Sequence, residues 1–196
     1  IMRTYTSTLH GIVDELAAET AEALRDEGVR VDAADGDLGP RPRSSILDRL
    51  TALSKRIVGR KQIVSALEGV SSQVTTFSRE QFSAQVKAGL GIDLASDPDL
   101  RAARTGFRNE NVSLIKSLCR EHVSRVRKVL DEAGSGTRVE EIAKSIREAT
   151  GASKSRAALI ARDQVLSLNG DVTEKRHKAA GITEFIWRSS RDERVR

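Results

Sequence analysis

The sequence has little of what stabilises small secreted proteins or builds metal sites. It contains one cysteine, Cys119, which has no partner for an internal disulfide, and three histidines. Its aromatic residues are one Trp, one Tyr and four Phe, so the base stacking that holds single-stranded nucleic acids is not indicated. No run approaches the roughly 18 apolar residues that span a bilayer, and no signal-peptide pattern is present. These absences favour a protein made in a reducing cytoplasm, without membrane contact.

Catalytic motifs are also absent from the sequence. There is no phosphate-binding glycine loop, no G-x-S-x-G and no H-E-x-x-H. Cys119 and His122 share a helix face, but a closed zinc site needs about four ligands, and His10 and His177 are distant in sequence. We interpret Cys119 as a half-buried thiol and His122 as a surface imidazole. We therefore predict no metal, no cofactor and no enzymatic activity.

Only three prolines interrupt a chain rich in Ala, Leu, Arg and Glu, so the composition predicts a mainly α-helical protein. Apolar spacing predicts a helix over residues 6–27, a surface linker over 28–43, and two or three helices packed as a hairpin over 44–88. Ser44 is the expected cap of the second helix, and Gly89 and Gly91 end the region. The expected buried positions are Leu9, Ile12, Leu16, Thr20, Ala23, Leu24, Ile46 or Leu47, Leu50, Leu53, Ile57, Ile63, Leu67, Val70, Val74, Phe77, Phe82 and Val86.

The second half predicts three further elements. Asp97 and Pro98 start a long basic helix that ends near Gly134, and its apolar face holds Val112, Ile115, Leu118, Val126 and Val129. A capping box of Thr137 and Glu140 starts the next helix, which Gly151 ends. Ser153 then caps a helix that runs to Gly181, with Ala157, Ile160, Val165, Leu168 and Val172 on one face. The β-branched and aromatic stretch ITEFIWR that follows predicts a short strand.

Charge is divided between the two halves of the chain. Residues 1–100 carry 12 Lys and Arg against 15 Asp and Glu, whereas residues 101–196 carry 21 against 13, so the net charges are −3 and +8. A basic half beside an acidic half suggests one face toward nucleic acid and another toward a protein partner. Such nucleic-acid contacts would be with phosphates and carry no sequence preference. The equally weighted alternative is that the Arg-rich helices are simply solvated.

The C-terminal half also contains an ordered series of short motifs: IARDQ, LNG, AGI, a Trp soon after, and DERVR. In this order and spacing they resemble the C-terminal domain of the phage head morphogenesis proteins, the Mu F-like minor head proteins. The resemblance extends through FRNENVSLIKSL and GTRVEEIAKSIREATG and covers roughly residues 107–196. Family members often carry Thr-Glu where this chain has Asp163-Gln164, and a His follows the final Arg-Val-Arg in them, beyond Arg196 here. The matching positions are Arg162, Asp163, Gln164, Asn169, Gly170, Gly181, Trp187, Asp192, Arg194 and Arg196.

Within these motifs, Arg162 lies in an otherwise apolar, alanine-rich helix. A buried Arg162 would need a carboxylate partner, for which Asp163 and Asp192 are the candidates. We favour a structural polar network that fixes the helix against the C-terminal strand, and the alternative is a surface for a partner. Trp187 is expected in the core.

The resemblance implies a non-enzymatic minor capsid protein of a tailed phage, found in the virion near the portal vertex and in the host cytoplasm during assembly. Its implied partners are the portal protein and other head proteins, with double-stranded DNA contacted through phosphates, and its implied roles are head assembly and DNA packaging or ejection. The expected fold is a helical bundle with a small α+β C-terminal domain. We divide the chain into an N-terminal helix (1–27), a linker (28–43), a helical region (44–106) and a Mu F-like domain (107–196), within an excerpt of a longer chain.

Two other functions stay open at this point. The first is a free-standing, non-specific DNA-binding protein, which would need a continuous basic face. The second is an enzyme, because phage proteins that look like this family are sometimes fused to toxin or transferase domains.

Overall fold

The computed structural model describes residues 1–26, 40–91, 97–133, 137, 139–182 and 184, and it describes only the backbone at 40–42, 90, 139 and 140. These residues form five helices: α1 (Met2–Asp26), α2 (Pro40–Val58), α3 (Lys61–Leu90), α4 (Arg101–Glu132) and α5 (Val139–Ala179). They contain no strand, so the mainly helical prediction is confirmed for them. None of these helices is apolar over a length that would cross a membrane.

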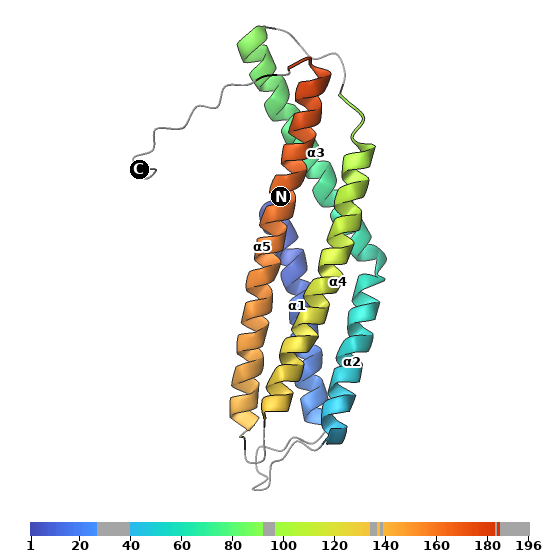
Figure 1. Ribbon diagram of the computed structural model, residues 1–196, viewed down its shortest axis with the longest axis vertical. Coiled ribbons are helices and arrows are strands. Elements are labelled where there is room, and N and C mark those ends of the chain that lie inside the picture. The colour runs from blue at the N-terminus through green and yellow to red at the C-terminus, as the bar shows by residue number, and fades with distance from the viewer. Residues whose placement is uncertain (27–39, 92–96, 134–136, 138, 183, 185–196) are drawn as a thin grey trace, which may run out of the picture.

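The helices form an elongated bundle whose cross-section changes along its length (Figure 1). In the lower half, α1, α2, α4 and α5 form a four-helix ring in which each helix packs on its two neighbours. Above the start of α1, only α3, α4 and α5 continue. At about 1.5 Å per residue, the 41 residues of α5 span about 60 Å, so this helix runs through both parts.

The apolar stripes that the sequence predicts form most of the core. Leu9, Leu16 and Leu50 are fully buried, as are Ile57 and Leu118. Each such side chain stabilises the fold by about 1.5–3 kcal/mol, so the stripes dominate the packing energy. Of the other expected core positions, Leu24, Val112 and Val129 are partly buried against the core, and Phe77 is wrong because it is half exposed on α3.

The predicted organisation of residues 44–88 needs two corrections. The helix starts at Pro40 rather than at a cap on Ser44, since the proline ring already has the helical φ and needs no N–H partner. The predicted hairpin is wrong, because α2 and α3 follow each other end to end around the turn at Gly59 (Figure 1). Residues 28–39 of the predicted linker lie outside the described residues, and its last four residues, 40–43, belong to α2. Gly91 ends α3 in the left-handed conformation, as predicted, with φ 68°.

The start of α4 also differs from the prediction. The helix begins at Arg101, and the backbone N–H of Arg101 donates to the carboxylate of Asp99 over 2.9 Å. Asp97, the predicted cap, instead binds the side chain of Arg176. The Asp97 carboxylate, which the sequence predicts as the cap of α4, therefore forms an ion pair with a distant residue instead.

A single continuous helix, α5, replaces the two that the sequence predicts. Gly151 lies inside the helix and does not end it, and Ser153 does not cap one. A glycine in a helix interior costs about 1 kcal/mol relative to alanine, which is less than the burial of Ile146 and Ile160 on its two sides contributes. Thr137 precedes the helix, but Arg138 and the side chain of Glu140 lie outside the described residues, so the capping box stays a prediction.

The end of α5 agrees with the sequence, but the element after it does not. Gly181, with φ 73°, forms a Schellman motif in which the N–H groups of Gly181 and Ile182 donate to the carbonyls of Lys178 and His177. The short strand is not seen: Ile182 and Glu184 are not in a strand, and the rest of ITEFIWR lies outside the described residues. The expected α+β C-terminal domain is therefore corrected to helix alone in the described part.

A buried arginine near the end of α5 connects this helix to the middle of α3 and to the segment that precedes α4. Arg176 of α5 is only 2% exposed, and its guanidinium donates to both carboxylate oxygens of Asp97 over 2.7 and 2.9 Å. It also donates to the Ser78 hydroxyl and the Thr75 carbonyl of α3, over 2.7 and 3.0 Å. Four hydrogen bonds compensate the desolvation of the buried charge. The hydrogen bond from Arg176 lowers the pKa of the Asp97 carboxyl below 3.8.

A second buried polar group joins α4 to α5 in the lower half. His122 is fully buried, and its Nδ1 lies 3.0 Å from the hydroxyl of Ser153. That hydroxyl donates to the Ala149 carbonyl, so Nδ1 of His122 is the donor and Nε2, which has no hydrogen-bond partner, carries the lone pair. Burial, together with the charge of Arg125, lowers the pKa of His122 to about 4. The prediction of a surface imidazole is wrong, and the side chain is a neutral part of the core.

We expect Asp97→Asn to lower the free energy of unfolding by about 3 kcal/mol, because it leaves the buried guanidinium of Arg176 without a counter-charge. This value is the low end of the range for buried pairs, since the side chain of Asp97 is one-third exposed. The loss should be complete above pH 3.8 and shrink as the pH falls through the lowered pKa of Asp97. Urea denaturation followed by circular dichroism measures both. Asp99→Asn, which breaks an exposed pair with Arg101, is the control and should change little.

The low pKa of His122 predicts that acid destabilises the protein. Between pH 6.5 and about 4 the unfolded chain binds a proton at this residue and the folded chain does not, so stability falls as the pH falls through this window. At about 1.4 kcal/mol per pKa unit, the loss reaches about 3 kcal/mol. His122→Gln should remove this part of the pH dependence in urea denaturation at pH 7, 5.5 and 4.5. Parallel curves for the wild type and the variant would contradict the assignment.

Candidate partner-binding surface

The exposed side of α5 carries two leucines seven residues apart. Leu159 and Leu166 are 49% and 56% exposed, whereas every other large aliphatic side chain that the structure describes on α5 is buried or half-buried. Seven residues are two helical turns, so the two leucines lie above one another with Arg162 and Asp163 between them and Gly170 beyond. We call these five residues the α5 outer face. A single exposed leucine needs no explanation, but this spacing is typical of a surface that packs against another helix.

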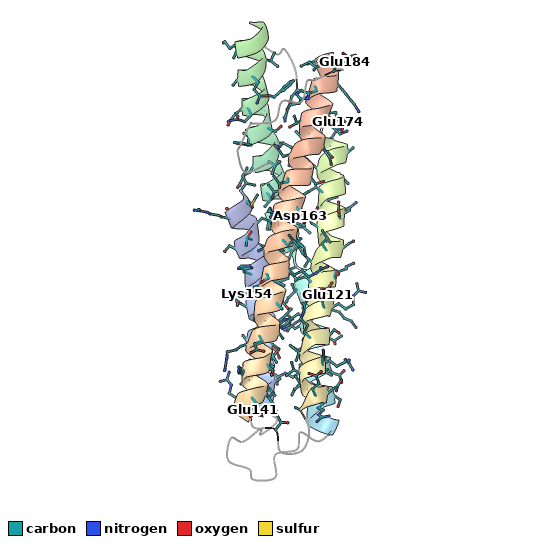
Figure 2. The ribbon with its side chains drawn as sticks, turned by 60° about the vertical axis from the view of Figure 1, so that its left-hand side comes forward. Glu121, Glu141, Lys154, Asp163, Glu174 and Glu184 are labelled. Carbon is teal, nitrogen blue, oxygen red and sulfur yellow. The ribbon has the colours of Figure 1, made fainter. Side chains whose placement is uncertain are left out.

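Arg162 lies on this face and not in the interior. Its side chain is 59% exposed, and its Nε lies 3.3 Å from the carboxylate of Asp163, which is itself 56% exposed. An exposed pair of this kind contributes at most about 1 kcal/mol to stability. The expectation of a buried Arg162 is therefore corrected. Figure 2 labels Asp163 near the middle of α5, at the height where α1 begins.

Gln164, the third polar residue of the IARDQ motif, faces the opposite way, toward α4. Its side-chain oxygen accepts from the Asn111 amide over 2.8 Å, and its amide donates to Glu110 over 3.0 Å. Asn111 is fully buried and accepts a hydrogen bond from the Tyr5 hydroxyl, while burial raises the pKa of that phenol far above its usual range. A chain of side-chain hydrogen bonds thus links α1, α4 and α5 at one level.

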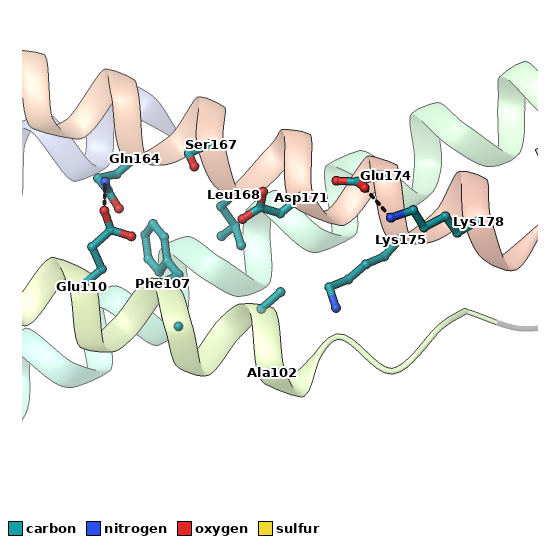
Figure 3. A pocket seen from close by; sticks show the side chains of 12 residues that line it. Ala102, Phe107, Glu110, Gln164, Ser167, Leu168, Asp171, Glu174, Lys175 and Lys178 are labelled. Atoms are coloured by element: carbon teal, nitrogen blue, oxygen red, sulfur yellow. Dashed lines mark hydrogen bonds and ion pairs between the residues drawn. The ribbon is translucent and has the colours of Figure 1, made fainter. Parts of the chain in front are cut away.

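A groove of about 610 Å³ lies beside Gln164, between α4 and α5 (Figure 3). Its α4 wall contains the small residues Ala102, Ala103 and Gly106, which leave the space between the helices open. The α5 wall is polar, and Glu174 and Lys178 form an ion pair along it. These opposite charges compensate one another, and the groove holds no pairing of a nucleophile with a base that would indicate catalysis.

Of the other predicted site residues, the structure describes only three, Asn169, Gly170 and Gly181. Asn169 is half-buried, Gly170 is exposed, and Gly181 ends α5. Trp187, Asp192, Arg194 and Arg196 lie outside the described residues. Cys119 is fully buried, and burial raises the pKa of its thiol to about 11, so the thiol stays protonated. Among the described residues, no three His, Cys, Asp or Glu side chains are grouped to hold a metal ion.

Comparison with known proteins finds a family similarity in the C-terminal part of the chain. Residues 125–196 match the family described as phage Mu protein F like protein. Residues 125–196 are therefore similar to this family, and we refer to them as the Mu F-like segment. An uncharacterized protein of Haemophilus influenzae is 29% identical over 140 residues, which cover 69% of this chain and 31% of that relative. The chain thus spans about a third of the relative's length, and no solved structure matches it.

The Mu F-like segment contains all of α5 and therefore the whole α5 outer face. It does not contain the helices that cover the buried side of α5, because α1, α3 and most of α4 come before residue 125. The predicted boundary at residue 107 also falls within α4. Within this segment, α5 is thus covered on one side by the preceding helices, and its outer face is exposed.

Sequence reasoning missed the residues that hold α5 in place. Arg176 follows Leu168 and Val172 at steps of four, so it continues the buried stripe, and this spacing was a usable signal. Ser153 gave no comparable signal, since a serine after a glycine predicts a helix cap as readily as a buried hydrogen-bond partner. The sequence shows both leucines, but whether they are buried or exposed depends on which side of α5 the other helices cover.

The packing predicts that the proposed domain, residues 107–196, does not fold by itself. Excision would remove α1 and α3, which pack on α5, so part of the buried side of α5 would be exposed to water. In circular dichroism, the fragment should be weakly helical and should melt without a cooperative transition, whereas the full chain should melt cooperatively. Adding residues 1–106 as a separate fragment should restore helicity. A cooperative transition of the isolated fragment would instead establish an independent domain.

Proposed function

We propose that this protein is a minor capsid protein of a tailed phage, associates with the portal protein and other head proteins, and contributes to head assembly and to DNA packaging or ejection. The observation that carries the proposal is the Mu F-like match over residues 125–196. The role is structural rather than enzymatic, and the protein would be found in the virion near the portal vertex and in the host cytoplasm during assembly.

The α5 outer face is the surface we assign to the head partner. Leu159 and Leu166 offer an apolar seam about 10 Å long, the distance that seven residues of helix cover. A partner helix that packs on this seam would bury the exposed half of each side chain, with a gain of about 1 kcal/mol for each, roughly half the value for a fully exposed leucine. Arg162 and Asp163 lie between them, and because their mutual ion pair stabilises the fold little, they can pair with charges of the partner instead.

The distribution of ion pairs favours this role over non-specific DNA binding. A DNA-binding face needs uncompensated Lys and Arg side chains in a continuous surface. On α4 and α5, these described basic residues lie within 4 Å of a carboxylate: Arg101, Arg108, Arg125, Lys128, Lys154, Arg156, Arg162, Arg176 and Lys178. Much of the positive charge of the described second half is therefore compensated within the fold.

The test is incorporation into heads. In cells that produce the phage without its own copy of this gene, the full chain and the double variant Leu159→Glu, Leu166→Glu are supplied from a plasmid. We expect the variant to fall at least about tenfold in copies per purified head and in portal protein retained on the tagged chain, because two charges replace the apolar seam. Quantitative mass spectrometry of purified heads gives the first value, and quantitative mass spectrometry of the material that binds to the tagged chain gives the second. The melting temperature should not change, since both side chains are half-exposed.

The control is Phe77→Glu, which places one such charge at a half-exposed apolar position of α3, outside the Mu F-like segment. It should enter heads like the wild type. Equal incorporation of the double variant would remove α5 as the interface, and absence of the wild type from heads would refute the head role. In that case the purified wild-type chain would be tested for binding to random DNA duplexes. Binding that weakens steeply with salt would favour the alternative, a non-specific DNA-binding protein.

A further inference from the structure

A second groove, of about 540 Å³, lies between α2 and α4, on helices that the α5 outer face does not involve. Figure 1 shows these two helices side by side in the lower part of the bundle. The residues that line the groove are Thr51, Ser54, Lys55, Val58, Lys116, Cys119, Arg120, Val123, Ser124 and Arg127.

The floor of this α2–α4 groove is apolar. It contains Val58, Val123 and the thiol of Cys119, whose raised pKa of about 11 keeps it uncharged at neutral pH. The hydroxyls of Thr51 and Ser54 donate to carbonyls of their own helix, over 2.8 Å in each case. These two polar side chains have therefore used their donors, and a ligand meets mostly hydrocarbon in the groove.

The rim of the same groove is basic. Lys55, Lys116, Arg120 and Arg127 are exposed, no Asp or Glu lines the groove, and none of the four has a carboxylate partner among the described residues. This contrasts with Arg125 of α4 and Arg156 of α5, which share Glu121 of α4. Three of the basic residues of α4 that have no carboxylate partner among the described residues, Lys116, Arg120 and Arg127, thus lie at one groove.

An apolar floor with a basic rim distinguishes a protein ligand from a nucleic acid. DNA phosphates could pair with the four cations. The DNA backbone would then lie over the apolar floor, however, and charged atoms placed there lose hydration without gaining a partner. An amphipathic helix satisfies both parts, because its apolar stripe covers the floor while acidic side chains on its flanks reach the rim. Exposed apolar grooves bordered by charge are the usual sites for such segments.

We propose that the α2–α4 groove binds an acidic amphipathic helix of a partner protein. Lys116, Arg120 and Arg127 lie four and seven residues apart on α4, so their Cα atoms span about 16 Å along the helix. The matching ligand has apolar residues at i, i+3 or i+4, and i+7, with Glu or Asp beside them over about three turns. The proposal concerns a different surface from the α5 outer face and does not depend on the head role.

The experiment uses the full chain and three fluorescent peptides of about 18 residues, a length of about five turns. The first has a leucine stripe flanked by Glu, the second has Lys in place of every Glu, and the third keeps Glu but has Ser in place of Leu. Fluorescence anisotropy should show at least about tenfold tighter binding of the first peptide than of either other, because only that peptide matches both the charge and the apolar floor.

A charge reversal of the groove supplies the matched variant. Arg120→Glu with Arg127→Glu should weaken the acidic leucine peptide at least about tenfold and make the Lys peptide the tighter ligand. The control, Lys144→Glu with Arg147→Glu, makes the same change in net charge at exposed positions of α5 and should bind like the wild type. Circular dichroism checks that both variants keep the wild-type fold.

Three results would overturn the proposal. The first is equal binding of the leucine and serine peptides, which would reduce the groove to an electrostatic surface. The second is loss of binding in the α5 control to the same extent as in the groove variant, which would place the site elsewhere. The third is no measurable binding of any peptide by the wild type, in which case duplex DNA at several salt concentrations tests whether the rim binds phosphate instead.

Discussion

The whole bundle depends on burying one side of α5 along its full length. No single partner helix is long enough, so α1 covers the lower part, α3 covers the upper part, and α4 runs beside both. Two buried polar contacts fix α5 in register against these partners: Ser153 with His122 below, and Arg176 with Asp97 above. Apolar side chains allow small sliding between helices, whereas hydrogen bonds at these two levels define one position.

Sequence periodicity predicted the helices and most of the core because apolar spacing reflects burial directly. It failed where a polar residue had two roles open to it. Asp97 looks like a cap because it precedes a proline, yet it compensates a buried guanidinium. Gly151 looks like a helix end, yet the buried side chains on both sides continue the helix through it. Tertiary contacts decided both cases, and one sequence does not record them.

Arg162 and Arg176 illustrate the same limit at the candidate site. Both are arginines in one helix, and the motif drew attention to Arg162. In the structure, Arg176 is buried and positions α5, whereas Arg162 is exposed beside Leu166. The two arginines differ in their position around the helix: Arg176 continues the apolar stripe and Arg162 does not. This position is a better guide to burial than membership of a motif. The exposed leucines acquired meaning only once the covered side of α5 was known.

The change from four helices to three has a mechanical consequence. A bundle that loses one helix at mid-height has a stiffer end and a more compliant end, since bending resistance grows with the number of packed rods. The hydrogen-bonded chain from Tyr5 through Asn111 to Gln164 lies where the fourth helix begins, next to Asp163. A partner bound at Leu159 and Leu166 would therefore hold the molecule near the boundary between the four-helix and three-helix parts, and the three-helix end would remain free to bend.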